Sequence, residues 1–222
     1  MIEKIVPATV ACAEAFADPP DAVLFPQEEA LLTETAAGKR RREFATGRQC
    51  ARTALAELGI APAPILRGAM GAPLWPAGIV GSITHCAGYR AAAVARGRDV
   101  LTTGVDAEPD EGLPAGVLEL VALPGERERL RGLAAAAPGT CWDRLLFSAK
   151  ESVYKAWFPL TGRWLGFHDA DITIDPAGGT FDARLLAAVE VSGFPLAGFA
   201  GRWLAEDGLI VTAVTVPARR HT

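Results

Sequence analysis

The spacing of apolar residues predicts a long helix in each half of the chain. In residues 28–58 apolar side chains recur at helical spacing, with a break near Gly38 and Gly59 as a stop signal. Residues 142–157 show the same period. One face of this second segment is apolar and carries Leu146, Ala149, Val153 and Trp157. Both helices are expected to pack against a core, and residues 116–136 are also expected to be helical.

Short runs with strand character follow each helical region. They cover residues 79–86, 89–97 and 100–108 in the first half, and 180–191, 196–206 and 209–216 in the second. Helices followed by antiparallel strands, twice over, predict an α+β fold made of two similar halves, residues 1–103 and 104–222. No sequence repeat supports this duplication, which rests on element order alone. A cleft between the halves is the expected ligand site.

Composition narrows the class of protein. The chain has 222 residues, of which 50% are hydrophobic and 22% charged, as in a folded protein with a sizeable core. The formal net charge of -4 argues against a nucleic-acid binder. The four cysteines are scattered and contain no C-x-x-C pair, which fits a reducing cytoplasm. The N-terminus imitates a signal peptide, but Glu3 and Pro7 interrupt it, and no apolar run reaches the ~20 residues of a membrane span. We therefore expect a cytoplasmic monomer without membrane or nucleic-acid partners.

Two carboxylates on one predicted strand are the first sign of chemistry. Asp106 and Glu108 are two residues apart, so both project from the same face. Neighbouring like charges are unfavourable unless a cation or hydrogen bonds compensate them. An all-oxygen pair suits a hard ion such as magnesium, which also binds phosphate oxygens. The alternative is a strand that ends in an acidic surface loop, because Asp110 and Glu111 follow. A magnesium site would need a third ligand, and Glu151 is the candidate.

The helix over residues 142–157 carries Glu151 and Lys155 one turn apart, away from its apolar face. The alternative to a functional face is a capping box, with Ser148 as the N-cap, and a solvated Glu to Lys pair. If the protein binds magnesium and a phosphate ligand, Glu151 and Lys155 are polar because their face of the helix lines the cleft.

Cations that could bind phosphate lie in the first half of the chain. Arg41, Arg48 and Arg52 lie along one flank of the first helix, and Arg40 lies nearer its apolar stripe. A solvated basic face is the alternative. His85 stands between small and hydroxyl residues, which is unusual for a core histidine, although a structural histidine remains the alternative. Arg67 lies in a loop rich in glycine and proline that could wrap a ligand.

Four stretches, in this order and spacing, resemble the motifs of 4'-phosphopantetheinyl transferases of the surfactin-synthetase-activating and enterobactin-synthetase type. They are "RREFATGRQCARTAL", "GAPLWPAGIVGSITHC", "GVDAEP" and "FSAKESVYKAW", and they span about half of the chain. The paired G-x-D-x-E and K-E-x-x-x-K patterns are specific in combination. The chain looks similar to actinobacterial members that serve polyketide and nonribosomal peptide synthetases.

The resemblance implies both a fold and a reaction. The family fold is a pseudo-dimer of two α+β halves, with coenzyme A in the cleft between them. The family transfers the 4'-phosphopantetheine arm of coenzyme A to a serine of an apo acyl or peptidyl carrier protein and releases 3',5'-ADP. Carrier proteins of polyketide, nonribosomal peptide or fatty acid synthases are the implied partners, with magnesium as the metal and manganese as an alternative. Residues 1–103 would hold the adenine and 3'-phosphate, and residues 104–222 the metal and the catalytic helix.

The resemblance also implies roles for individual residues. Asp106, Glu108 and Glu151 would bind magnesium, and Glu151 would help to deprotonate the serine. Lys150 and Lys155 would neutralise the phosphates. The nucleotide end would be held by Arg40, Arg48, Arg67, Thr84 and His85, although the helical wheel leaves Arg41 open as the alternative to Arg40. Catalysis would rest on Asp106, Glu151 and Lys155.

The sequence departs from the family pattern at Met70, where a basic residue is common in the family. Two other functions compete with the transferase. A magnesium-dependent hydrolase of a nucleotide pyrophosphate would break down coenzyme A without labelling a carrier. A catalytically silent module would bind coenzyme A or carriers, but it would not need a complete set of acidic ligands.

Overall fold

The computed structural model describes residues 1–32, 38–191 and 193–218. Its α-helices are α1 (Pro26–Glu29), α2 (Gly38–Glu57), α3 (Val117–Val121), α4 (Pro124–Ala136) and α5 (Trp142–Thr161). Short 3-10 helices are η1 (Ile2–Lys4), η2 (Ala69–Gly71) and η3 (Phe167–Asp169). The first four strands are β1 (Val10–Ala15), β2 (Ile79–Cys86), β3 (Tyr89–Arg96) and β4 (Val100–Pro109). The last four are β5 (Ala170–Asp175), β6 (Thr180–Val191), β7 (Phe194–Glu206) and β8 (Leu209–Pro217).

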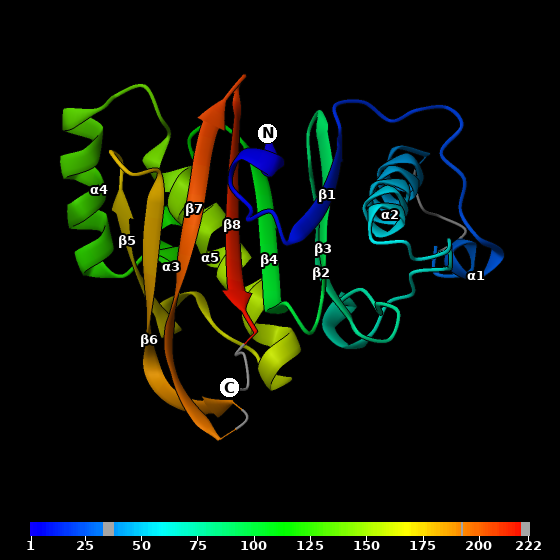
Figure 1. Ribbon diagram of the computed structural model, residues 1–222. Helices are drawn as coiled ribbons and strands as arrows, with labels where there is room; N and C mark the ends of the chain where they lie inside the picture. The colour runs from blue at the N-terminus through cyan, green and yellow to red at the C-terminus, as the bar shows by residue number, and fades with distance from the viewer. Residues whose placement is uncertain (33–37, 192, 219–222) are drawn as a thin grey trace.

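The strands form two antiparallel sheets, and a long helix covers each of them (Figure 1). The first sheet has the order β1-β3-β2, and the second has the order β4-β8-β7-β6-β5. Helix α2 packs on β3 and β1, whereas α5 packs on β4 and β8. The α+β prediction with antiparallel sheets is therefore confirmed. The similarity of the two halves stays a prediction, and the expected boundary between residues 103 and 104 falls inside β4.

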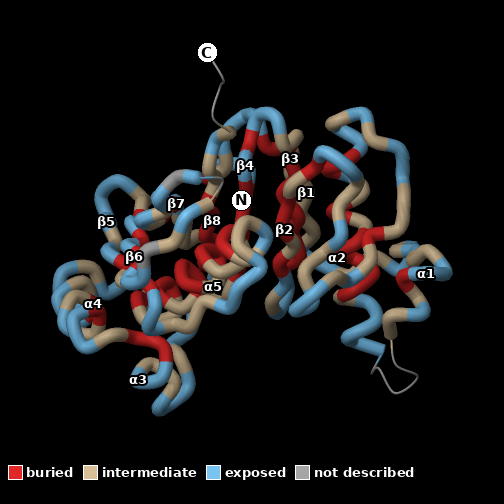
Figure 2. Tube along the Cα trace, turned by 90° about the horizontal axis from the view of Figure 1, so that it is seen from below, coloured by how far each residue is buried: buried red, intermediate tan, exposed pale blue. Residues whose placement is uncertain are grey.

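Alternation along β3 explains how one strand serves two cores. Ala91, Ala93 and Ala95 face a cluster shared with β4 and β8, whereas Ala92 and Val94 face α2. The small side chains let the second sheet approach closely on one side and α2 on the other. Buried residues consequently concentrate where β4, β8 and α5 meet and where β3 lies between its neighbours (Figure 2).

The predicted elements match the structure best in the strands after residue 79 and in the two long helices. Strands β1 and β5 were missed, because no strand was predicted before residue 79 or between residues 158 and 179. The helix predicted over residues 116–136 is divided into α3 and α4, since Pro124 lacks an N–H and starts a new helix. Part of the helix predicted over residues 28–58 lies outside the described residues, and the remainder forms α1 and α2.

Helix α5 begins where it was predicted and ends at Thr161, with Gly162 in the left-handed conformation as its cap. In the described part of the chain, no helix has the length and apolar character needed to cross a membrane.

Gly104 lets α5 lie directly on β4. A Cβ atom at this position would lie 2.5 Å from the backbone nitrogen of Ala156 and would collide with the carbonyl oxygen of Ser152. Both obstacles are helix backbone, which cannot move aside like the end of a side chain. Glycine is therefore required here by the close approach of strand and helix.

We predict that Gly104→Ala destabilises the protein by about 1–3 kcal/mol or more, because the added methyl group forces α5 away from β4. Urea denaturation followed by circular dichroism measures the effect. Gly132→Ala is the matched control, since nothing lies within 4 Å of a Cβ at Gly132. Equal stability of the two variants would contradict the required close contact.

Candidate active site

The two sheets meet where β2 lies beside β4, and side chains provide the hydrogen bonds between them. The hydroxyl oxygen of Ser82 accepts a hydrogen bond from the backbone N–H of Val105 at 3.1 Å. The hydroxyl oxygen of Thr84 accepts one from the N–H of Ala107 at 3.0 Å. Thr84 also lies 3.3 Å from Oδ1 of Asp106, to which its hydroxyl donates. Thr84, predicted to line the nucleotide pocket, is thus buried and holds β4 and its carboxylate in place.

Asp106 forms an ion pair with Lys155 at this junction. Its Oδ1 lies 2.6 Å from Lys155 Nζ, which also donates to the carbonyl oxygen of Val105 at 3.2 Å. Asp106 is only 4% exposed, and its Oδ2 is buried without a hydrogen-bond partner among the described residues. A buried carboxylate oxygen without a donor is unfavourable. This oxygen is therefore available to a cation that enters the site.

Glu108 has a partner that the sequence did not suggest. Arg144, in the first turns of α5, places Nη1 3.0 Å from Glu108 Oε2. The same guanidinium donates to the carbonyl oxygens of Glu111 at 2.9 Å and Gly112 at 3.1 Å. Burial and the charge of Asp106 raise the pKa of Glu108, and Arg144 opposes this shift. Arg144 could not have been found from the sequence, because its role depends on how α5 lies against β4.

Glu151 is half-buried and, with Lys155, lines a cavity of about 680 Å³. Burial raises its pKa, Lys155 opposes the shift, and Asp106 adds to it. The rest of the lining comes mainly from the loop of residues 68–75, strand β2 and the end of α5. Glu151 and Lys155 thus face a cavity, which agrees with the expectation for the polar face of the helix. Ser148 lies inside α5 and bonds to Thr212 at 3.0 Å, so the capping-box interpretation is wrong.

The described residues contain no group of three His, Cys, Asp or Glu side chains placed to hold a metal ion. The expected cluster of Asp106, Glu108 and Glu151 is therefore not assembled in this arrangement. The physical reason is that each β4 carboxylate is paired with a cation from α5, Asp106 with Lys155 and Glu108 with Arg144. The donor set still fits a hard cation, since Asp106 keeps one buried oxygen without a partner and all three groups are carboxylates.

Two arginines flank one aromatic ring beside the loop. The guanidinium of Arg48 lies 4.3 Å from the ring centroid of Phe44, and that of Arg67 lies 4.8 Å from it. Burial lowers the pKa of Arg48 to about 10; Glu28 opposes this shift, and the charge of Arg67 adds to it. Two cations that lie close to the same ring and repel each other form a favourable place for an anion. Arg48 already donates to the carbonyl oxygen of Ile65 at 2.8 Å.

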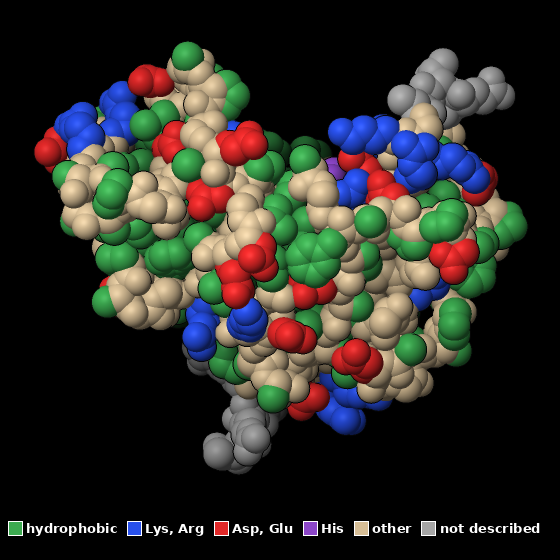
Figure 3. All heavy atoms as spheres, turned by 90° about the horizontal axis from the view of Figure 1, so that it is seen from above, with side chains coloured by type: hydrophobic (Ala, Val, Ile, Leu, Met, Phe, Trp, Pro, Cys, Tyr) green, Lys and Arg blue, Asp and Glu red, His purple; other side chains and the backbone are tan. Residues whose placement is uncertain are grey.

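The remaining predicted cations differ in their surroundings. Arg40 is exposed near the start of α2, whereas Arg41 and Arg52 are engaged in ion pairs with Glu29 and Glu28. His85 is exposed, but neighbouring protein atoms and the charge of Lys155 lower its pKa. From above, Lys and Arg side chains gather on the half that carries α2, beside a hollow between the halves (Figure 3).

Lys150 does not join this group. It is buried, and its Nζ lies 2.8 Å from Glu126 on the opposite side of α5 from the Asp106 pair. The structure therefore brings together Asp106, Lys155 and Thr84, and it places Glu151 on the same cavity as Lys155. Lys150 and Glu151 both line a second, smaller cavity, but the ammonium group of Lys150 pairs with Glu126 and not with Asp106.

An acidic pair on an edge strand, paired with cations of the helix that crosses it and placed beside a cavity, suits an enzyme that acts on phosphate groups. Two family models cover most of the chain. The 4'-phosphopantetheinyl transferase N-terminal domain matches residues 27–95, and the 4'-phosphopantetheinyl transferase superfamily matches residues 102–192.

Curated relatives match over nearly the full length. 4'-Phosphopantetheinyl transferase Svp of Streptomyces mobaraensis is 54% identical over 226 residues, covering 100% of this chain and 92% of the relative. 4'-Phosphopantetheinyl transferase PptT of Mycobacterium tuberculosis is 50% identical, with 97% and 98% covered. Enterobactin synthase component D of Salmonella typhimurium is 31% identical, with 90% and 81% covered. The chain belongs to the 4'-phosphopantetheinyl transferase family and is a transferase.

We predict that Thr84→Val destabilises the protein by about 1–3 kcal/mol, because the N–H of Ala107 then stays buried without an acceptor. Thermal unfolding measures the change. Thr84→Ser keeps the hydroxyl group and should retain most of the stability. A Thr84→Val protein as stable as the serine variant would show that this hydroxyl does not support the junction.

Proposed function

We propose that the protein transfers the 4'-phosphopantetheine arm of coenzyme A to a serine of apo acyl and peptidyl carrier proteins, and releases 3',5'-ADP. The observation that carries this proposal is the Asp106 to Lys155 pair, with a buried carboxylate oxygen free to take a cation, next to a cavity that Glu151 and Lys155 line. Family membership supports the transfer, and the site chemistry supports a phosphate-bearing substrate.

The residues around the cavity suggest how coenzyme A lies. The nucleotide end would lie toward the loop of residues 68–72, where Arg48 and Arg67 flank Phe44 and could bind the 3'-phosphate. Arg40 and His85 would add positive charge from the exposed edge. The pyrophosphate would lie at Glu151 and Lys155, at the boundary between the halves. Residues 1–103 would thus serve mainly the nucleotide, and residues 104–222 the reaction.

The reaction requires an attacking oxygen, a proton acceptor and charge neutralisation. The serine oxygen of the carrier attacks the β-phosphorus, and the bond from that phosphorus to the bridging oxygen of the pyrophosphate breaks. Glu151 accepts the serine proton, since burial and the charge of Asp106 raise its pKa above its ordinary value, although Lys155 opposes this shift. Lys155 neutralises charge on the phosphate oxygens and on the departing 3',5'-ADP.

Asp106, Glu108 and Glu151 would hold magnesium, or manganese in its place. The bound ion would supply charge neutralisation at the pyrophosphate. Glu108 would have to share its carboxylate with Arg144. Carriers of polyketide, nonribosomal peptide or fatty acid synthases are the proposed partners. The monomeric state and the cytoplasmic location stay predictions.

Intact mass spectrometry of an apo carrier protein tests the proposal. Incubation with this protein, coenzyme A and magnesium should add one phosphopantetheine group, and EDTA should prevent the addition. Breakdown of coenzyme A with no labelled carrier would instead support a hydrolase. Binding of coenzyme A without either reaction, across several carrier types, would support a silent module.

We expect Asp106→Asn and Glu151→Gln each to lower the rate of transfer on the order of 100-fold or more, since one loses a cation ligand and the other the proton acceptor. Carrier labelling over time measures the rates, and circular dichroism checks the fold. The control Arg98→Met changes an exposed side chain in the turn between β3 and β4 and should leave the rate unchanged. A well-folded Glu151→Gln protein with normal turnover would exclude the role of Glu151.

Arg67→Met should remove the preference for coenzyme A over dephospho-coenzyme A, which lacks the 3'-phosphate. Loss of one charge-assisted hydrogen bond corresponds to roughly a tenfold change in affinity for coenzyme A, with little change for the dephospho form. Isothermal titration calorimetry measures both constants, and Arg98→Met again serves as control. If the variant keeps the full preference, the 3'-phosphate lies elsewhere.

A further inference from the structure

The side chain of Lys150 is buried in the protein interior, although its neighbour Glu151 faces the larger cavity. Its Nζ lies 2.8 Å from Glu126 Oε2, 2.5 Å from the carbonyl oxygen of Phe167 and 2.9 Å from that of Ala170. The side chain is 3% exposed, against 26% for Lys155. An ammonium group has three N–H donors, and these three oxygens account for all of them. Lys150 therefore has no donor left for a phosphate.

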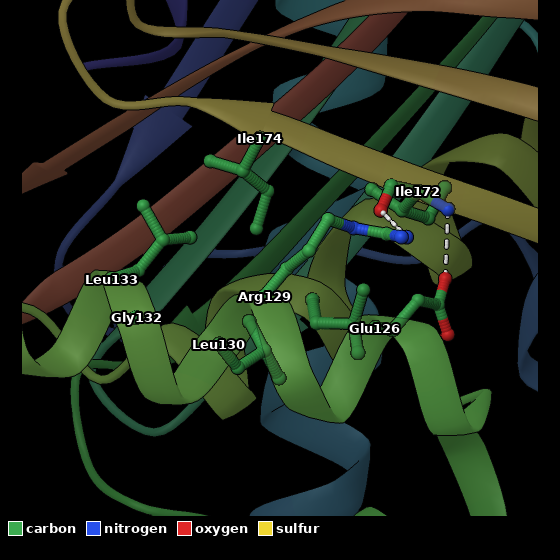
Figure 4. Close-up of a pocket in the computed structure, with 8 residues that line it drawn as sticks. Glu126, Arg129, Leu130, Gly132, Leu133, Ile172 and Ile174 are labelled. Atoms are coloured by element: carbon green, nitrogen blue, oxygen red, sulfur yellow. Dashed lines mark hydrogen bonds between the residues drawn. The ribbon is translucent and has the colours of Figure 1, made fainter.

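Both carboxylate oxygens of Glu126 are also engaged. Glu126 is 1% exposed, and its Oε2 accepts the backbone N–H of Leu123 at 2.7 Å as well as the ammonium of Lys150. Its Oε1 accepts the N–H of Ile172 at 2.7 Å, a contact seen in Figure 4. One carboxylate thus connects the start of α4, the middle of α5 and strand β5. Removing either charge of such a buried pair leaves the other without compensation.

Lys150 contacts the segment of residues 162–170, which connects α5 to β5. Lys150 binds the far end of this segment through the two carbonyl oxygens, and Trp157 Nε1 binds its near end through the carbonyl oxygen of Arg163 at 2.8 Å. Between these points the ring of Trp164, which is 64% exposed, lies 5.0 Å from the ring of Tyr154. The position of the exposed Trp164 ring therefore depends on how the backbone of this segment is held.

The segment forms one wall of a second cavity of about 100 Å³, and the other wall is α5. Lys150, Glu151 and Tyr154 line this cavity from the side of α5, and Glu151 and Tyr154 also line the larger one. A substrate with its pyrophosphate at Glu151 and its nucleotide end toward Arg67 would extend its arm in the direction of the smaller cavity.

We infer that Lys150 is a positioning residue that, together with Glu126, clamps residues 162–170 against α5 and so shapes the cavity wall beside Glu151, instead of binding phosphate. The inference rests on the proposed function only in naming coenzyme A as the molecule that contacts this cavity wall. The two lysines of the K-E-x-x-x-K pattern then have separate tasks, Lys155 toward the phosphates and Lys150 toward the fold of the wall.

The test compares Lys150→Met with Lys155→Met in two measurements. Calorimetry gives the affinities for coenzyme A and for 3',5'-ADP, which lacks the arm. Hydrogen exchange with mass spectrometry follows the amides of residues 162–170. For Lys150→Met we expect roughly tenfold weaker coenzyme A binding, little change for 3',5'-ADP and faster exchange in the segment. For Lys155→Met we expect weaker binding of both ligands and unchanged exchange in the segment.

Glu126→Gln is the second variant, in case Lys150→Met fails to fold. Glutamine keeps the shape of the side chain, and residue 126 has no proposed contact with phosphate. Faster exchange in residues 162–170 together with selective loss of coenzyme A affinity supports the clamp. Unchanged exchange in a folded variant overturns it, as does equal loss of coenzyme A and 3',5'-ADP affinity in Lys150→Met. The two proposals can fail separately, because the exchange measurement needs no ligand. A wild-type protein that does not bind coenzyme A would contradict the proposed function. The exchange rates of residues 162–170 would still decide whether Lys150 and Glu126 clamp this segment.

Discussion

The buried edge of β4 is the constraint on which the structure depends. A strand at the edge of a sheet has backbone N–H groups on one side without partners, and burial makes each of them unfavourable. In this protein β4 is such an edge, and β2 of the other sheet covers it. The hydroxyl groups of Ser82 and Thr84 replace the missing carbonyl acceptors. The two halves can therefore meet without a continuous sheet, and the meeting place is also where Asp106 lies.

Helix α5 lies on the other side of the same strand, and its charges match those of β4. Arg144 pairs with Glu108 and Lys155 pairs with Asp106, while Gly104 lets the helix backbone reach the strand. These pairs compensate two carboxylates that would otherwise repel each other at short range. Because the pairs are formed by the cations of one helix, a ligand that competes for Asp106 or Lys155 acts on strand and helix together.

Local motifs made much of this predictable from the sequence. The alternation in residues 100–108 placed Asp106 and Glu108 on one face, and the helical period in residues 142–157 placed Glu151 and Lys155 away from the core. Strand β1 was missed because its sequence, Val10–Ala15, consists mainly of small residues that also suit a targeting segment. Arg144 and Glu126 were missed because their partners are distant in sequence. Lys150 was predicted to bind phosphate because it belongs to the K-E-x-x-x-K motif. The direction of its side chain depends instead on how α4 and β5 pack against α5, and no local sequence pattern contains this information.

The alternation along β4 links the chemistry of the site to correct folding. Val105 and Ala107 lie in the core between the sheets, and Asp106, between them, faces α5. A shift of the β4 pairing by a single residue would exchange these faces, placing carboxylates in the apolar core and alanine or valine opposite Lys155. Such a misfolded chain would lose its core and its charge pairs in the same step. Errors in strand register are therefore removed by instability before they can yield a folded but inactive enzyme.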